Sequence, residues 1–323
     1  MGNLARLLQH RFREACPPGW VCTVEHRIMS TQLERELGFA PRADVLLARK
    51  DGSRRLWIEF EVSRADPVAN HAKFAAAHLF EPQLATDAFV SMTTTHVTRG
   101  RGNLAATSVY LMRAVGMSAF QTVLLPSFDG SSIHALNARP LEALLGGEEI
   151  KVMPEIDRVI NVSEPVARTR DGHSIHLAAN LLEVMLNVRA WNTEIRMSDA
   201  SKLWERRTVT FFVYDPQSQA FAPSKFCAFV PIHLRATVAP NALSMTLATY
   251  STLSESEPRF DGNVAQRHLT RHLGMRAMPI EQANSTTADL FRSWHRRVAS
   301  AIALHPRGPV LLLPVAASPD RED

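Results

Sequence analysis

Two short extended segments joined by an Asp-Gly turn constrain this chain more than any other feature. Residues 43–48 and 56–62 are rich in aliphatic and aromatic side chains, and the Asp51-Gly52 pair lies between them. An Asp-Gly pair between two such segments is typical of a tight β-hairpin. We therefore expect residues 43–62 to form two antiparallel strands.

Acidic side chains occupy matching places on the two predicted strands. Asp44 stands at the start of the first strand, and Glu59 and Glu61 stand on the second. Because side chains alternate along a strand, Glu59 and Glu61 share one face, and strand pairing can bring Asp44 close to both. Such a cluster of carboxylates is unfavourable unless protons or a cation neutralise it. Carboxylate oxygens suit Mg²⁺ or Mn²⁺, although two acids on one strand also occur on an ordinary solvent-exposed face.

The segments around the hairpin alternate between helical and extended patterns. Leu4, Leu7, Leu8 and Phe12 form one apolar stripe, which predicts a first helix that Pro17 stops. Asp66 and Pro67 are suited to cap and open another helix. The expected order through residue 125 is helix 4–16, strand 20–28, the two hairpin strands, a helix from residue 66, strand 88–94, helix 103–115 and a buried parallel strand 120–125. This order predicts an α/β domain with a mixed sheet.

The segments RADVL (42–46) and IEFEV (58–62) resemble the motif of the PD-(D/E)xK nuclease superfamily. The step of 15 residues from Asp44 to Glu59 lies within the usual range of that family. The family core runs helix, three strands, helix, strand, as the predicted elements of residues 4–95 do. The resemblance covers roughly the first 125 residues. It implies a restriction-endonuclease-like core, with a mixed central sheet flanked by helices, that hydrolyses phosphodiester bonds.

The resemblance also implies a metal site. Asp44 and Glu59 would bind Mg²⁺, with Mn²⁺ as a substitute, together with the main-chain carbonyl of Phe60. Glu14, on the first predicted helix, is a candidate additional carboxylate near this site. The metal would polarise the phosphodiester and favour hydroxide as the attacking group.

The catalytic base stays open between two residues. Glu61 stands where most members of the family have lysine, although a minority of type II restriction endonucleases have glutamate there. By the resemblance, Glu61 would orient or deprotonate the attacking water, or hold a second metal. Lys73, on the following helix, is the alternative source of a displaced positive charge, and a solvated helix lysine is an equally good interpretation.

The rest of the chain has fewer signals. Helix 140–146, helix 177–190, strands 208–214 and 225–232, a strand pair in 237–253, and helices 263–273 and 285–304 are expected. We expect a nuclease domain at 1–150, an α+β region for DNA recognition at 151–316 and a disordered tail at 317–323. Polar and basic residues in loops and on helices are candidates for DNA contacts: Arg99, Arg101, Ser224, Lys225, Arg267 and Arg271. A solvated surface is the competing interpretation for each.

Composition sets further limits. The chain has 323 residues, 36 lysines and arginines against 32 acids, and three cysteines without a paired spacing. These numbers are compatible with nucleic-acid binding and give no sign of a disulfide framework. The charged amino terminus is unlike a signal peptide, and no apolar run is long enough for a membrane span. We therefore expect a cytoplasmic protein without a membrane partner.

The sequence thus predicts a Mg²⁺-dependent, sequence-specific endonuclease for double-stranded DNA, of the kind found in restriction systems, acting as a homodimer. One alternative is a nuclease for modified DNA or for DNA repair. Another is a catalytically inactive DNA-binding module that keeps a nuclease fold. Metal titration separates the inactive module from the nucleases, and digestion of methylated and unmethylated DNA separates the nucleases from one another.

Overall fold

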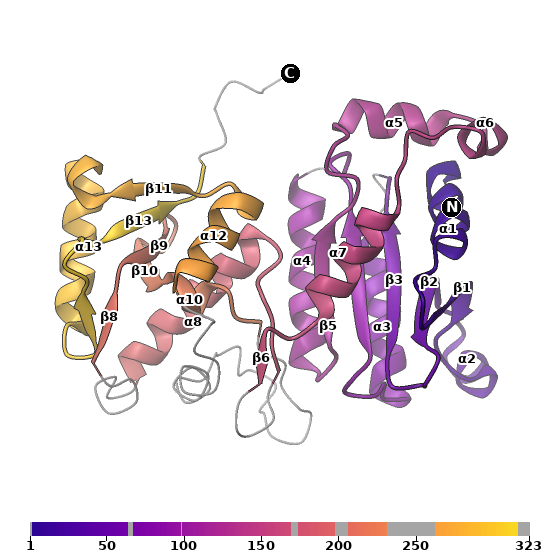
Figure 1. Cartoon of the computed structure of the whole chain (residues 1–323). Coiled ribbons are helices and arrows are strands. Elements are labelled where there is room, and N and C mark those ends of the chain that lie inside the picture. Colours follow the sequence, from indigo (N-terminus) through magenta and orange to yellow (C-terminus); the bar gives the residue numbers. More distant parts are fainter. Residues whose placement is uncertain are drawn as a thin grey trace. The chain divides into compact units, whose positions relative to one another are not determined.

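The computed structural model describes residues 2–63, 67–97, 99–168, 174–197, 206–230 and 262–315. The chain divides into two compact units, of which the first extends through Glu164 and the second begins at Pro165. Figure 1 labels the elements of both units. Among the described residues, no helix combines the length and the apolar character needed to cross a membrane.

A mixed five-stranded sheet in the order β1-β2-β3-β4-β5 forms the centre of unit 1. The first three strands pair in antiparallel fashion, and β3, β4 and β5 are parallel. The strands are β1 (Trp20–Arg27), β2 (Arg42–Arg49), β3 (Arg55–Glu61), β4 (Ala88–Thr93) and β5 (Ala119–Val123). The hairpin, the mixed sheet and the order of elements are thereby confirmed, with one additional short helix, α2 (Thr31–Leu37), capped by the Ser30 side chain.

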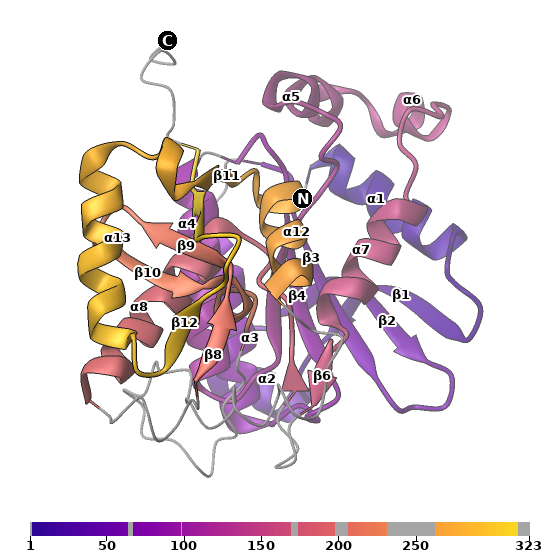
Figure 2. The same cartoon turned by 60° about the vertical axis from the view of Figure 1, so that its left-hand side comes forward.

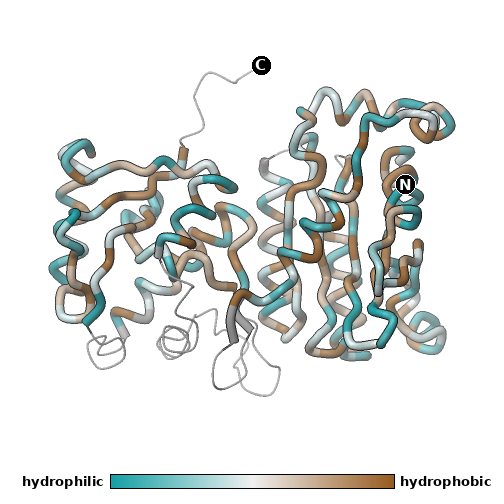
Figure 3. Tube along the Cα trace, viewed as in Figure 1, coloured by the Kyte–Doolittle hydropathy of each residue, from teal (hydrophilic) through white to brown (hydrophobic). Residues whose placement is uncertain are grey.

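Helices cover both faces of this sheet. Helix α1 (Asn3–Glu14) packs on β1 and β2, and its Phe12 ring contacts Phe60 edge-on at 5.0 Å. Helices α3 (Pro67–Phe80) and α4 (Arg99–Ala114) pack together against the opposite face, where Trp57 and Phe89 lie in a shared apolar core. Every residue of β3 after Arg55 is buried, and Figure 3 shows hydrophobic residues along the strands.

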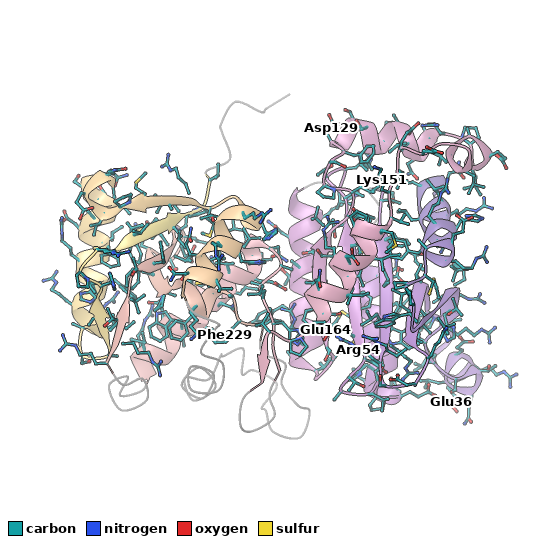
Figure 4. The ribbon with its side chains drawn as sticks, in the orientation of Figure 1. Glu36, Arg54, Asp129, Lys151, Glu164 and Phe229 are labelled. Carbon is teal, nitrogen blue, oxygen red and sulfur yellow. The ribbon has the colours of Figure 1, made fainter. Side chains whose placement is uncertain are left out.

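The described part of unit 1 has three further helices: α5 (Gly130–Ala138), α6 (Leu141–Leu145) and α7 (Met153–Ser163). Helix α6 confirms the helix expected at 140–146, whereas α5 and α7 were not predicted. Helix α7 packs on β4 and β5, so it belongs to unit 1 although it lies beyond residue 150. Arg54 of the hairpin forms an ion pair with Glu164 at the end of α7, and these two side chains lie together in Figure 4.

Unit 2 contains a four-stranded sheet in the order β10-β9-β13-β11 and two smaller strand pairs. Helix α8 (Leu181–Met197) packs on β9 and β10, and α13 (Ser285–Val298) packs on β10 (Figure 2). The Phe291 ring of α13 contacts the Phe221 ring of β10 edge-on. The other elements are β6 (Ala167–Arg168), β7 (Ser174–Ile175), β8 (Arg207–Val209), β9 (Phe211–Asp215), β10 (Ala220–Pro223), α10 (Ser224–Cys227), α12 (Gly262–Leu273), β11 (Arg276–Pro279), η1 (Ile280–Gln282), β12 (Ile302–Leu304) and β13 (Val310–Leu313).

Two strand predictions in unit 2 are wrong. The predicted strand 208–214 is divided between β8 and β9, which belong to different sheets. Residues 224–227 form the helical turn α10 in place of the start of a strand 225–232. The Asn187 side chain on α8 donates to the carbonyls of Cys227 and Phe229, which therefore do not take part in a strand ladder. Residues 231–232, the predicted strand pair at 237–253 and the tail at 317–323 lie outside the described residues.

Several element boundaries also differ from the predictions, including the end of α8, which lies at Met197 instead of residue 190. Residues 99–102 form the first turn of α4 in place of a loop. Helix α8 begins at residue 181 because the Asn180 side chain accepts from the Glu183 N–H, while the Glu183 carboxylate accepts from Ala179 N–H. Helix α13 ends at Val298, and residues 302–304 form β12 in place of a helical end.

Candidate active site

The two strands of the hairpin separate at the acidic residues. The β2–β3 ladder ends at the pair Val45–Ile58, and Asp44 and Glu59 do not continue it. In place of a ladder bond, Asp44 Oδ2 accepts from the Phe60 N–H at 2.8 Å. The Asp44 carboxylate of β2 is therefore held on the main chain of β3, close enough to Glu59 for the two charges to repel each other.

Two residues that the sequence did not indicate complete this arrangement. Gln9 on α1 donates through Nε2 to Glu25 Oε1 at 2.8 Å and to Asp44 Oδ1 at 3.3 Å. Glu25 lies on β1 opposite Asp44, at a gap in the β1–β2 ladder between the pairs Val24–Val45 and His26–Ala43. Its φ of 50° is unusual for a residue other than glycine, and such strained backbone occurs often at functional sites.

Both glutamates of β3 are buried. Glu59 is 4% exposed and Glu61 is 6% exposed. Beside them on β4 are polar side chains in register, with Ser91 next to Glu59 and Thr93 next to Glu61. The fully buried His71 of α3 faces Glu61, with His71 Nε2 3.9 Å from Glu61 Oε1. Both glutamates are therefore buried, Glu61 beside His71 of α3, and neither lies on an open, solvated face of the sheet.

Burial and mutual repulsion favour the protonated forms of two of these acids. Desolvation, helped by the charge of Glu25, raises the pKa of Asp44 to about 6, against the opposing effect of its hydrogen bonds. Desolvation raises the pKa of Glu59 well above its usual value, and the charges of Asp44 and Glu61 act in the same direction. Glu59 Oε1 is buried and accepts no hydrogen bond from the residues that the structure describes. A cation at this place would replace the missing partner and reverse the preference for protons.

The donor atoms around Asp44 fit a hydrated Mg²⁺. Mg²⁺ is commonly held by one or two carboxylates while it keeps several waters. Asp44 and Glu59 supply two carboxylates, and the Phe60 carbonyl lies on the same side of β3 as its N–H, which faces Asp44. That carbonyl also accepts from the Val62 N–H at 3.2 Å. Within the described ranges, no three acidic, histidine or cysteine side chains gather closely enough to enclose a metal ion by themselves.

Two of the other predicted residues lie apart from this site. Glu14 is exposed near the end of α1 and contacts His10 and Arg11. Lys73 is exposed on α3 two residues after His71, so it lies on a different side of the helix from the ring that faces Glu61. The structure thus places His71, and not Lys73, next to the acids.

The predicted DNA contacts are dispersed over both units. Arg101 is exposed in the first turn of α4. Arg99 is the first residue of that helix, and the structure describes its main chain only. Arg267 and Arg271 are exposed one turn apart on α12, so they share one side of that helix. Two further candidates adjoin a pocket of unit 2: Ser224, which is buried and donates to the Gly262 carbonyl, and Lys225, which is partly exposed.

Comparison with protein-family models, with curated proteins and with solved structures finds no match for this chain.

Proposed function

We propose that this protein is a Mg²⁺-dependent DNA endonuclease whose active site contains Asp44, Glu59 and Glu61. The observation that carries the proposal is the buried pair Asp44–Glu59 at the point where β2 and β3 separate. One Glu59 carboxylate oxygen there has no hydrogen-bond partner among the described residues. A fold that was selected only for stability gains nothing from two adjacent carboxylates whose pKa values are raised by burial. The pair is readily explained as a site prepared for a cation.

The order of elements supports the same assignment. The chain runs α1, β1, α2, β2, β3, α3, β4, and the three-stranded antiparallel start with an α3 crossover to parallel β4 agrees with the resemblance to PD-(D/E)xK nucleases. We propose the restriction-endonuclease-like fold for unit 1 on this basis. Unit 2, an α+β unit with exposed arginines on α12, is proposed as the DNA-recognition part.

Each residue of the site has a chemical task in this proposal. Asp44, Glu59 and the Phe60 carbonyl would hold Mg²⁺, which supplies a water of lowered pKa and stabilises charge on the phosphodiester. Gln9 and the Phe60 N–H fix the Asp44 carboxylate so that its two oxygens keep one orientation. Glu61, on the same face as Glu59, would accept the proton of the attacking water, in the place of the lysine that is usual in the family.

Plasmid cleavage tests the proposed reaction. Supercoiled plasmids from methylating and non-methylating hosts, and unmodified amplified DNA, are incubated with Mg²⁺, Mn²⁺ or EDTA. We expect cleavage by the wild type with a divalent cation and none by Asp44→Asn. Asp51→Asn is the matched control, because Asp51 is an exposed acid in the turn of the same hairpin and Asn-Gly also suits that turn. Cleavage restricted to methylated DNA would identify a modification-dependent nuclease.

Cleavage by Asp44→Asn at the wild-type rate would reject the assigned active site. Binding of DNA without cleavage of any of these substrates would instead identify an inactive DNA-binding module.

We also propose that the enzyme acts as a two-fold homodimer. Duplex DNA has two antiparallel strands, and the described part of one chain presents one Asp44–Glu59 pair. A dimer matches the symmetry of the protein to that of the duplex and cuts both strands. The same plasmid assay measures this, since a dimer converts supercoiled DNA to linear DNA. Nicked circles as the sole product, together with a monomeric mass of the DNA complex in light scattering, would reject the dimer and leave the chemistry intact.

A further inference from the structure

Unit 2 contains a pocket that the nuclease reaction does not use. It has a volume of about 460 Å³, within the range of roughly 300–1,000 Å³ that small-molecule sites occupy. It lies between the strands β8 and β9, the short helix α10 and the first described turn of α12. All of these elements belong to the same compact unit.

The lining of the pocket is suited to an anion. Its polar side chains include Arg207, Lys225, His305, Thr208 and Thr210, and no acidic side chain is among the described lining residues. Arginine and lysine provide positive charge and N–H donors, and the two threonines provide hydroxyl donors. A phosphate group matches such a set of donors better than any neutral or cationic ligand does.

His305 is oriented as a further donor. Its Nδ1 accepts the main-chain N–H of Arg307 at 3.1 Å, which leaves the proton of the neutral imidazole on Nε2. The His305 main chain is fixed in turn, because its N–H donates to the Val209 carbonyl at 3.0 Å. The ring therefore carries an N–H group at Nε2.

The pocket is larger than a single phosphate requires. Val209, Phe211 and Pro223 add apolar surface beside the polar groups. A nucleotide combines one anionic group with a sugar and a flat base that can lie against such surface. We propose that this pocket binds a nucleotide through its phosphate group. The nucleotide is either a free mononucleotide or one unit of a DNA strand, and both present the same phosphate chemistry.

Thr208 allows a test that leaves the fold intact. Its side chain is exposed at the pocket, so replacement does not disturb a packed core. Thr208→Glu adds one negative charge to the lining, and Thr208→Gln is the matched control that adds the same bulk without charge. Arg297→Gln, at an exposed position of α13 outside the lining, controls for a general loss of positive charge.

Binding is measured on the full chain with two probes and without any cleavage step, so failure of the nuclease proposal does not affect the result. Deoxynucleoside monophosphates are titrated by calorimetry, and a fluorescein-labelled single-stranded 10-mer is titrated by anisotropy. We expect Thr208→Glu to bind about tenfold more weakly than Thr208→Gln. The introduced carboxylate and the phosphate are like charges a few ångströms apart, and their repulsion lowers the affinity by about that factor. Arg297→Gln should bind as the wild type does.

The two probes also identify the source of the phosphate. A Thr208→Glu effect on both probes supports a site for free nucleotides, and an effect on the 10-mer alone supports a site for a DNA strand. Absence of saturable binding for both probes would overturn the proposal. Equal affinities of Thr208→Glu and Thr208→Gln for every probe that binds would also overturn it.

Discussion

Asp44→Asn should stabilise the metal-free protein while it abolishes cleavage. Burial raises the pKa of Asp44 from 3.8 to about 6. Each pH unit of such a change corresponds to about 1.4 kcal/mol, so the ionised Asp44 destabilises the folded state by about 3 kcal/mol above pH 6. Asparagine has nearly the same shape, carries no charge and still accepts the Phe60 N–H through its side-chain oxygen.

The stability difference between Asp44→Asn and the wild type should depend on pH in a defined direction. The folded state binds the Asp44 proton more tightly than the unfolded state does, so the stability of the wild type falls as the pH rises from about 4 to about 6. The advantage of Asp44→Asn should therefore grow from about 1 kcal/mol at pH 4.5 to about 3 kcal/mol at pH 8. Asp51→Asn should show no such gain, because hydrogen bonds from Ser53 lower the pKa of this exposed acid.

The assay is urea denaturation in EDTA, read by pulse-labelling hydrogen exchange of peptides that cover β2 and β3. These peptides report on unit 1 separately from unit 2. Addition of Mg²⁺ should stabilise the wild type and leave Asp44→Asn unchanged, because a ligand stabilises only the state that binds it. Two results would refute the reasoning. One is an Asp44→Asn variant that is less stable than the wild type at pH 8. The other is a difference in unfolding free energy between variant and wild type that is the same at pH 4.5 and pH 8.

Three further changes test the surrounding residues. Glu61→Gln should lower the single-turnover cleavage rate by at least a hundredfold and leave Mn²⁺ binding in place; a normal rate would remove Glu61 as the base. Glu25→Gln should lower the pKa of Asp44, because it removes a nearby negative charge; carboxyl ¹³C NMR titration measures this, and an unchanged or higher value would contradict it. Lys73→Ala should cleave within about twofold of the wild-type rate, since Lys73 is exposed and turned away from the acids; a large loss would return Lys73 to the site.

The sequence predicted those parts of unit 1 that depend on local signals. The Asp51-Gly52 pair predicted the hairpin, and strand periodicity predicted that Glu59 and Glu61 share a face. The sequence did not predict Gln9 and Glu25 as site residues. Their role depends on where α1 and β1 lie relative to Asp44, and local spacing in the sequence does not reveal this. The one local hint for Gln9 is a polar residue next to the apolar stripe of α1, where it is buried in the fold.

The sequence of unit 2 was harder to interpret for a different reason. The segment after Pro223 is apolar like a strand. Its backbone conformation is determined by Asn187, which lies 40 residues before Cys227 and donates to the carbonyls of Cys227 and Phe229. The strands β11 and β13 are only four residues long each, too short for alternation to distinguish them from loops. Tertiary contacts therefore overrode local preference in this unit.

Mn²⁺ binding tests the central claim most directly, since it requires no knowledge of the DNA sequence that the protein recognises. Electron paramagnetic resonance measures free Mn²⁺ as the wild-type protein, Glu59→Gln or Glu36→Gln is added. Glu36→Gln is the matched control, because Glu36 is an exposed glutamate on α2. We expect the wild type and Glu36→Gln to bind Mn²⁺, with competition by Mg²⁺, and we expect Glu59→Gln to lose this binding. Binding that Glu59→Gln leaves unchanged, or no binding by the wild type at millimolar Mn²⁺, would contradict the claim that Asp44 and Glu59 form a metal site.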